Sequence, residues 1–186
     1  PSGRLFGAFP RRRLEAELIR DAMLAASGSL NRTMHGQGIR PRIHSSVIAT
    51  STTRKWPLVR QETAEHWRRS VYVHVRRSVL MPLLESFDAP PTTESCAARV
   101  TTTVPTQALQ LLNDRFANEQ SRRMAESIRV ATGKDVVRQV ELAFWRTLSR
   151  PPEAAELREC VEFVNREGLS GLCHVLFNIN EFVFVD

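Results

Sequence analysis

Arginine-rich polar side chains are the clearest candidates for chemistry in this sequence. A guanidinium group binds carboxylate, sulfate or phosphate in fork geometry, and a tyrosine hydroxyl suits the same oxyanions. The stretch from Arg68 to Arg77 carries four arginines and Tyr72. If the fold brings these side chains together with polar residues further along the chain, they would form an anion-binding cleft. Its predicted members are Arg68, Arg69, Tyr72, Arg76, Arg77, Asp88, Arg99, Gln107 and Asn113.

A structural role is the alternative for part of this set. The connection from Asp88 to Thr103 is rich in Pro and Thr, so its backbone polar groups need partners from outside the segment. Arg99, Asp88 and Asn113 are suited to fasten the connection onto the helices. We favour this interpretation over convergence into a cleft.

The long segment from Ser29 to Pro57 is a second candidate region. It is punctuated by Gly, Pro, Ser and Thr and has no sustained hydrophobic period, which predicts a loop with at most a short strand at Val47–Ala49. Loops of this length inside a compact domain are usually functional or disordered. The predicted binding residues of the loop are His35, Arg40, Arg42 and His44.

Signatures of known chemistry are not recognised elsewhere. The histidines form no H-E-x-x-H spacing, so no metal ligand is assigned, and no G-x-S-x-G, phosphate-cradling glycine loop or paired carboxylate motif occurs. We therefore assign no catalytic residue and leave open whether the protein is an enzyme. Trp56, Trp67 and Trp145 would suit a sugar platform, but core positions are favoured.

The three cysteines, Cys96, Cys160 and Cys173, are far apart. They form no C-x-x-C and no C-x-x-C-H motif, so neither zinc nor haem is expected in this chain. Cys160 and Cys173 flank a predicted helix-to-helix turn and would be able to form a disulfide in an exported protein. We favour two small buried apolar residues instead.

Charge is distributed unevenly along the 186 residues, which include 26 basic and 20 acidic side chains. Residues 1–77 carry 15 basic and 5 acidic groups (+10), and residues 78–186 carry 11 and 15 (−4). This asymmetry indicates either an anion-binding face or two halves that pack with complementary charge, and we favour the second. No nucleic acid is expected, because no recognition motif accompanies the basic charge.

Internal pairing of the arginines follows from that choice. We expect Arg13, Arg20 and Arg99 to be paired within the domain, with acidic helices such as Glu153–Glu162 as partners. Only the loop arginines are expected to stay free, namely Arg32, Arg40, Arg42 and Arg54.

Hydrophobic periodicity predicts a mainly α fold. Arg11–Ser27 has Leu14, Leu18, Ala22 and Ala25 at helical spacing and is followed by Gly28, and Ile19, Met23 and Ala26 widen this apolar stripe. Alternating valines over Val71–Val75 predict a small strand, although Arg68, Tyr72 and Arg76 also share the four-residue spacing of a helix. A helical turn interrupted by Pro82 is expected over Ser78–Phe87.

The second half of the chain predicts an antiparallel helical bundle over Thr106–Asn180. Five apolar stripes are separated by Gly or Pro, and short connections between helices make neighbours antiparallel. For the second of these helices we expect a cap at Asp114, an end at Gly133 and a stripe formed by Phe116, Ala117, Gln120, Met124 and Ile128. We expect a single domain over residues 1–186, with a basic helix-and-loop part (1–103) and the bundle (104–186). No apolar run approaches the roughly 18 residues of a membrane span.

Four ordered strings link the sequence to a family. RRRLEAELIRDAMLAASGSLNRTM, RRSVYVHVRR followed by LLESFDAP, SCAARVTTTVPTQALQLLND and LCHVLFNINEFVFVD resemble the C-terminal domain of unknown function of large exported proteins from planctomycetes and related bacteria. The resemblance implies export to the periplasm or cell envelope and upstream domains, often with a cytochrome c-like haem module. It implies no reaction. Where the family usually has G-G-P, this chain has residues 35–38, His-Gly-Gln-Gly.

Together these observations favour a non-catalytic interaction or scaffold module within an exported multidomain protein of the cell envelope. The chain is expected to be part of a longer protein and to carry no cofactor itself, with any haem elsewhere in the parent. Its expected partners are the upstream domains or other envelope proteins. The alternative is the binding or processing of an anionic polysaccharide, sulfated or uronic, through the arginine-rich cleft.

Overall fold

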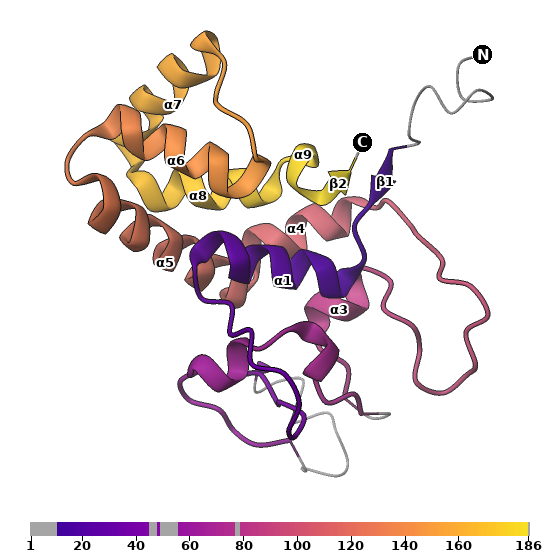
Figure 1. Ribbon diagram of the computed structural model, residues 1–186. Helices are drawn as coiled ribbons and strands as arrows, with labels where there is room; N and C mark the ends of the chain where they lie inside the picture. The colour runs from indigo at the N-terminus through magenta and orange to yellow at the C-terminus, as the bar shows by residue number, and fades with distance from the viewer. Residues whose placement is uncertain (1–10, 45–47, 49–55, 77–78, 186) are drawn as a thin grey trace, which may run out of the picture.

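Helices make up most of the chain in the computed structural model, which describes residues 11–44, 48, 56–76 and 79–185 (Figure 1). This confirms the mainly α fold class. The elements in chain order are β1 (Arg12–Arg13), α1 (Ala16–Ser27), the 3₁₀ helices η2 (Ala64–Trp67) and η3 (Ser70–Tyr72), α3 (Pro82–Ser86), α4 (Pro105–Asn113), α5 (Arg115–Thr132), α6 (Val136–Leu148), α7 (Ala154–Glu167), α8 (Leu169–Asn178), α9 (Asn180–Val183) and β2 (Phe184–Val185).

Helix α5 is the centre of the helical part. It packs against α8, α1, α6 and α4, and α7 packs against α6 and α8. Figure 1 shows the loops between α1 and α3 gathered at one end of the molecule, away from α6 and α7. The long connection after α3 runs outside the helices before it reaches α4.

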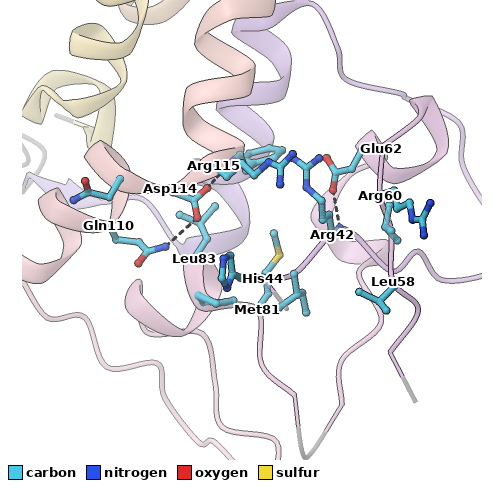
Figure 2. Close-up of a pocket in the computed structure, with 15 residues that line it drawn as sticks. Arg42, His44, Leu58, Arg60, Glu62, Met81, Leu83, Gln110, Asp114 and Arg115 are labelled. Carbon is cyan, nitrogen blue, oxygen red and sulfur yellow. Dashed lines mark hydrogen bonds between the residues drawn. The ribbon is translucent and has the colours of Figure 1, made fainter. Parts of the chain in front are cut away.

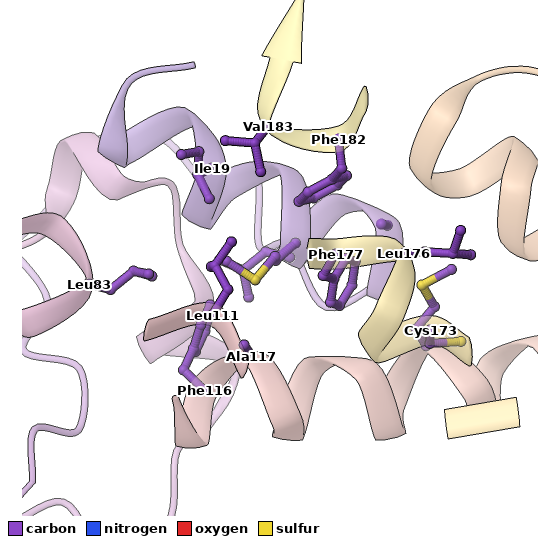
Figure 3. Close-up of a cluster of buried hydrophobic side chains, with 14 of the residues drawn as sticks. Ile19, Leu83, Leu111, Phe116, Ala117, Cys173, Leu176, Phe177, Phe182 and Val183 are labelled. Carbon is purple, nitrogen blue, oxygen red and sulfur yellow. The ribbon is translucent and has the colours of Figure 1, made fainter. Parts of the chain in front are cut away.

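One hydrophobic core joins the first helix to the bundle. Ile19 and Met23 of α1 are fully buried, as are Met124 of α5 and Phe177 of α8 (Figure 3 shows part of this cluster). A separate small cluster under the loops comprises Ile43, Ile48, Trp56 and Val79. The basic N-terminal part and the bundle thus share their main core.

The predicted caps and stripe of α5 are confirmed. Asp114 accepts hydrogen bonds from the backbone N–H groups of Phe116 (2.7 Å) and Ala117 (3.2 Å), which satisfies two donors that a helix start leaves unpaired. Gly133 follows the last residue of the helix, as expected. Every residue of its predicted apolar stripe is buried: Phe116, Ala117, Gln120, Met124 and Ile128.

Helix α1 differs from the prediction in its start and in its buried face. It begins at Ala16 because Arg12 and Arg13 pair with β2, antiparallel, opposite Val185 and Phe184. Leu18, expected in the core, is half exposed, while Arg20 is completely buried. Ile19, Met23 and Ala26, predicted to widen the stripe, are buried, and the buried face centres on them. It also includes Arg20, which a purely apolar count misses.

The strand predicted over Val71–Val75 is wrong. Residues 70–72 form η3, and Val71 and Val75 are 73% and 58% exposed, whereas Val73 is buried and forms a single bridge with Ile39. The sequence alternates, but residues 70–72 form a 3₁₀ turn that packs against α1 instead of an extended strand. Helix α3 begins at Pro82 and is not interrupted by it, because Pro is well suited to the first helical position.

Two further expectations concern cysteines and membranes. Cys96, Cys160 and Cys173 are free thiols, so the disulfide between Cys160 and Cys173 is not formed. Burial raises the pKa of the Cys173 thiol to about 12, and this side chain is part of the core. None of the helices in the described ranges is both long and apolar enough to cross a membrane.

Two positions on α5 provide a matched test of the core. Ile128→Ala removes a side chain with 0% exposure and should lower the free energy of unfolding by about 2–5 kcal/mol. Val130→Ala, on the same helix at a position 80% exposed, should change it by less than about 0.5 kcal/mol. Urea denaturation of both variants checks the pair, and equal losses would contradict the packing described.

Candidate functional site

Arg20 is the most deeply buried charged group of the described chain. Its guanidinium donates to the carbonyl oxygens of His66 (2.7 Å) and Arg68 (3.1 Å) and to the hydroxyl of Ser70 (3.1 Å). The nearest carboxylate oxygen, from Asp21, is 3.7 Å away, and burial lowers the pKa of Arg20. This arginine therefore holds the 66–70 segment on helix α1.

Arg68 organises the exposed loop that follows Asn31. It is buried, and it donates to the backbone carbonyls of Thr33 (3.2 Å) and Gln37 (2.9 Å) and to that of His35. Its guanidinium lies 4.0 Å from the centroid of the Tyr72 ring, and the Tyr72 hydroxyl accepts the backbone N–H of His35 at 2.8 Å. The donors expected to bind an external anion are used on the chain itself.

Asp88 fastens the connection between α3 and α4. It accepts the backbone N–H of Thr102 at 2.7 Å and forms an ion pair with Arg13 at 2.6 Å. The side-chain amide of Gln107 donates to the carbonyls of Ser86 (3.1 Å) and Thr102 (3.2 Å). Arg13, Asp88 and Gln107 thus anchor both ends of this connection.

The remaining predicted cleft residues lie apart from these contacts. Arg99 binds both carboxylate oxygens of Glu17, at 2.8 and 3.0 Å, and pairs with Glu15 at 3.0 Å. Arg76 forms a bridge with Val79, and its Nη1 atom is buried without a hydrogen-bond partner in the described structure. The Asn113 amide donates to the Leu109 carbonyl of its own helix at 2.9 Å.

The predicted cleft is therefore dispersed. The structure brings Arg68 to Tyr72, and Asp88 to Gln107, but it places these pairs, Arg99 and Asn113 in separate surroundings. Arg69 is exposed, and Arg77 lies outside the described residues. Proximity in the sequence suggested that the arginines converge. In the structure, Arg68 holds the loop after Asn31, Arg76 forms a bridge with Val79, and Arg99 pairs with Glu17.

A groove elsewhere collects other arginines. Two hollows, of about 550 and 590 Å³, share Arg42, Arg60 and Arg115 in their walls and therefore lie next to each other; together they are here called the arginine groove. Figure 2 shows Arg115, from the start of α5, and Arg42 reaching into the space beside Glu62, with Arg60 at the outer rim. The second hollow is completed by Gln61, Asn118, Glu119 and Arg122.

The charge of the second hollow is strongly positive. Four arginines and one glutamate line it, which gives 4 − 1 = +3. Arg42, expected to be free, instead pairs with Glu119 at 2.5 Å, and its backbone N–H donates to the buried Glu62 carboxylate at 2.8 Å. No carboxylate of the described residues pairs with Arg60, Arg115 or Arg122.

The first hollow is chemically mixed. It is lined by the apolar side chains of Leu58 and Met81 and by the polar groups of Gln110, Asn113 and Asp114. Gln110 donates to Asp114 at 3.0 Å, but burial still raises the pKa of the Asp114 carboxyl. This end of the groove offers carboxylate and amide groups, and the other end offers guanidinium groups.

The loop candidates are divided between two places. Arg42 and His44 line the arginine groove, whereas His35 and Arg40 line a different hollow with His66 and Arg68. Sequence reasoning missed Arg60, Arg115 and Arg122. Arg115 and Arg122 are seven residues apart on one helix and so share a face, a signal visible in the sequence but overlooked because the helix was examined only for apolar residues.

The charge pairing between the two halves differs from the expected one. Arg13, Arg20 and Arg99 do have partners inside the domain, but none is in Glu153–Glu162: Arg20 binds mainly carbonyls, and Arg99 binds α1 and the residue before it. In α7, Glu156 pairs with Arg150, which lowers the pKa of Glu156 to about 2. Arg32 and Arg40 have no acidic partner among the described residues, and Arg54 lies outside that range.

The described residues hold no group of three or more His, Cys, Asp or Glu side chains placed to bind a metal ion.

The tryptophans agree only in part with the core positions expected of them. Trp56 is buried and donates to the Pro41 carbonyl, and the partly buried Trp67 donates to Glu62. Trp145 is half exposed, contrary to expectation.

Removal of the Arg20 charge should destabilise the domain, because this side chain holds the 66–70 segment on helix α1. Arg20→Met leaves two backbone carbonyls and a hydroxyl without their donor, and we expect a loss of about 3 kcal/mol or more in the free energy of unfolding. Arg158→Met, at an exposed position of α7, is the control and should be nearly neutral. Chemical denaturation distinguishes the two, and a stable Arg20→Met protein would contradict the anchoring role.

Asp114 can be tested through its pH dependence. Because its pKa is raised in the folded state, the wild-type carboxyl favours folding most at acid pH and loses that contribution as pH rises through the folded pKa. Asp114→Asn keeps an acceptor for the helix start without this loss, so its stability relative to wild type should improve with rising pH. Asp114→Ala lacks the same carboxyl, so its difference from wild type should change with pH in the same direction, but it should stay about 1 kcal/mol less stable than Asp114→Asn at every pH because it offers no acceptor to the helix start. Denaturation over a pH series decides, and equal losses for Asn and Ala would contradict the capping geometry.

Comparison with known proteins gives a family and no function. No curated protein and no solved structure matches the chain. Residues 1–164 match the family described as PSD1, protein of unknown function (DUF1553). The first three strings identified in the sequence lie within this range, and the fourth, residues 172–186, lies outside it. This match covers most of the 186 residues, and the chain therefore belongs to the PSD1 (DUF1553) family.

Proposed function

We propose that this domain is a non-catalytic interaction and scaffold module of a larger, exported protein of the cell envelope. The observation that carries the proposal is the use of Arg68, whose donors hold the carbonyls of Thr33, His35 and Gln37. An exposed loop fixed from inside by a buried side chain keeps one shape without a ligand. Such pre-organised loops bind partners at lower entropic cost.

The surface of this loop suits a protein partner. Met34 is 59% exposed, and Arg32 and Arg40 extend from the same loop without acidic partners among the described residues. A solvent-exposed methionine between cations supplies apolar contact together with charge complementarity for an acidic surface. The expected partners are the upstream domains of the parent protein, including a haem module where the parent has one, or other envelope proteins.

Association between separately produced parts tests this proposal. The domain and the upstream part of its parent protein should bind each other saturably in isothermal titration calorimetry. Arg32→Glu with Arg40→Glu should weaken the interaction at least about tenfold, because two attractive contacts become repulsive. The matched control is Arg129→Glu with Arg158→Glu, which makes the same change of net charge on exposed helix positions.

Two results would reject the interaction role of the loop. One is the absence of association by analytical ultracentrifugation when both parts are folded. The other is an equal loss of affinity for the loop variant and the control variant, which would attribute binding to net charge alone.

A second candidate function is favoured by one observation. The arginine groove holds Arg115 and Arg122 without acidic partners in the described structure, next to polar groups that suit hydroxyls. This supports binding of an anionic polysaccharide at a place different from the cleft predicted around Arg76.

A further inference from the structure

We propose that the arginine groove binds a linear anionic polysaccharide, with Arg115 and Arg122 holding successive carboxylate or sulfate groups and the mixed hollow holding the hydroxyls between or beside them. The inference rests on the second candidate function and names its site and ligand class. It draws on unpaired charge, on spacing along one helix, and on the chemistry of the mixed hollow.

The charge at this site is available to a ligand. In other parts of the described chain, arginine donors are used internally: Arg13 binds Asp88, Arg20 binds carbonyls and Arg68 holds a loop. In the groove, Glu119 is paired with Arg42, and no carboxylate of the described chain pairs with Arg115 or Arg122. Two exposed guanidiniums in a concave wall are ready to bind oxyanions in fork geometry.

Spacing on α5 selects an extended ligand. Arg115, Asn118, Glu119 and Arg122 follow each other at positions i, i+3, i+4 and i+7, so they form one stripe along the helix. Seven residues of α-helix span about 10 Å. A single small anion can therefore engage one end of the stripe, whereas a chain with recurring anionic groups can engage both ends. The expected consequence is that polymers bind more tightly than their monomers.

The other hollow argues for hydroxyls as the second kind of ligand group. Asp114, Gln110 and Asn113 line it, and the side-chain amide oxygens of Gln110 and Asn113 can accept hydrogen bonds from hydroxyl groups. A DNA backbone presents hydrogen-bond acceptors and no hydroxyl donors, so it would leave the acceptors of this hollow without partners. Phe116 is the only Phe, Tyr or Trp among the groove residues, and it is buried, so the stacking platform of large aromatic side chains typical of single-strand binding does not form there.

The experiment titrates the 186-residue domain with four carbohydrate probes: polygalacturonate, dextran sulfate, neutral dextran and monomeric galacturonate. Saturable binding by calorimetry is expected for at least one polyanion, with a monomer at least about tenfold weaker and neutral dextran silent. Comparison of polygalacturonate with dextran sulfate tells whether carboxylate or sulfate is the preferred group. Raising the ionic strength to the physiological range should weaken binding without unfolding the protein.

Matched charge variants separate the groove from general basic character. Arg115→Gln with Arg122→Gln should lower the affinity at least about tenfold, because two charge-assisted contacts are lost. Arg129→Gln with Arg158→Gln removes the same charge from exposed helix positions and should change it less than about twofold. Arg76→Ala should retain binding, since Arg76 does not line the groove. Thermal melts confirm that each variant is folded.

Three outcomes would overturn the proposal. Equal loss in the two double variants would mean that net charge alone attracts the polymer. A monomer that binds as tightly as the polymer would mean a simple anion site. Single-stranded DNA or polyglutamate that binds more tightly than either polysaccharide would place the ligand in another class. The loop variant Arg32→Glu with Arg40→Glu should leave this binding intact, so a failure here and a failure of the interaction role remain distinguishable.

Discussion

The hydrogen bonds of one buried guanidinium, that of Arg20, attach the loop segment 66–70 to the helical core. Arg20 projects from helix α1, which belongs to the helical core, and its donors end on the carbonyls of His66 and Arg68. Moving a charge into the interior is costly, and it is stabilised here by carbonyl and hydroxyl acceptors more than by a counter-charge. Because Arg68 lies in the segment so fixed, the loop that Arg68 organises depends on Arg20 as well.

Two groups of arginines differ in their partners, apart from those that pair with glutamates, such as Arg99 and Arg150. Those that are buried, Arg13, Arg20 and Arg68, bind backbone carbonyls or Asp88 and give shape to segments with no regular structure. Arg115 and Arg122, which line the groove along α5, are exposed and have no carboxylate partner among the described residues. Composition alone cannot separate the groups, since the same residue type serves both, and only burial and partners tell them apart.

The helical part was largely predictable from sequence, and the candidate site was not. The stripe from Phe116 to Ile128 and the cap at Asp114 are local signals, because a helix repeats every 3.6 residues and its start needs an acceptor. Alternation over Val71–Val75 failed because the backbone of that segment is set by contacts with α1, from residues some fifty positions earlier. The groove likewise joins Arg60 to Arg115 across the fold, and no spacing rule connects such distant positions.

The small sheet determines how the domain would respond to mechanical load. Strands β1 and β2 are antiparallel, with Arg12 opposite Val185 and Arg13 opposite Phe184, and Figure 1 shows both leaving the domain on the same side. A force that separates the two ends of this pair acts across the strands, so the inter-strand hydrogen bonds open one after another instead of sharing the load. Tension would thus separate the two short strands at low force. The next bond under load would be the one between the Leu14 N–H and the Val183 carbonyl, next to helix α1 and the end of α9.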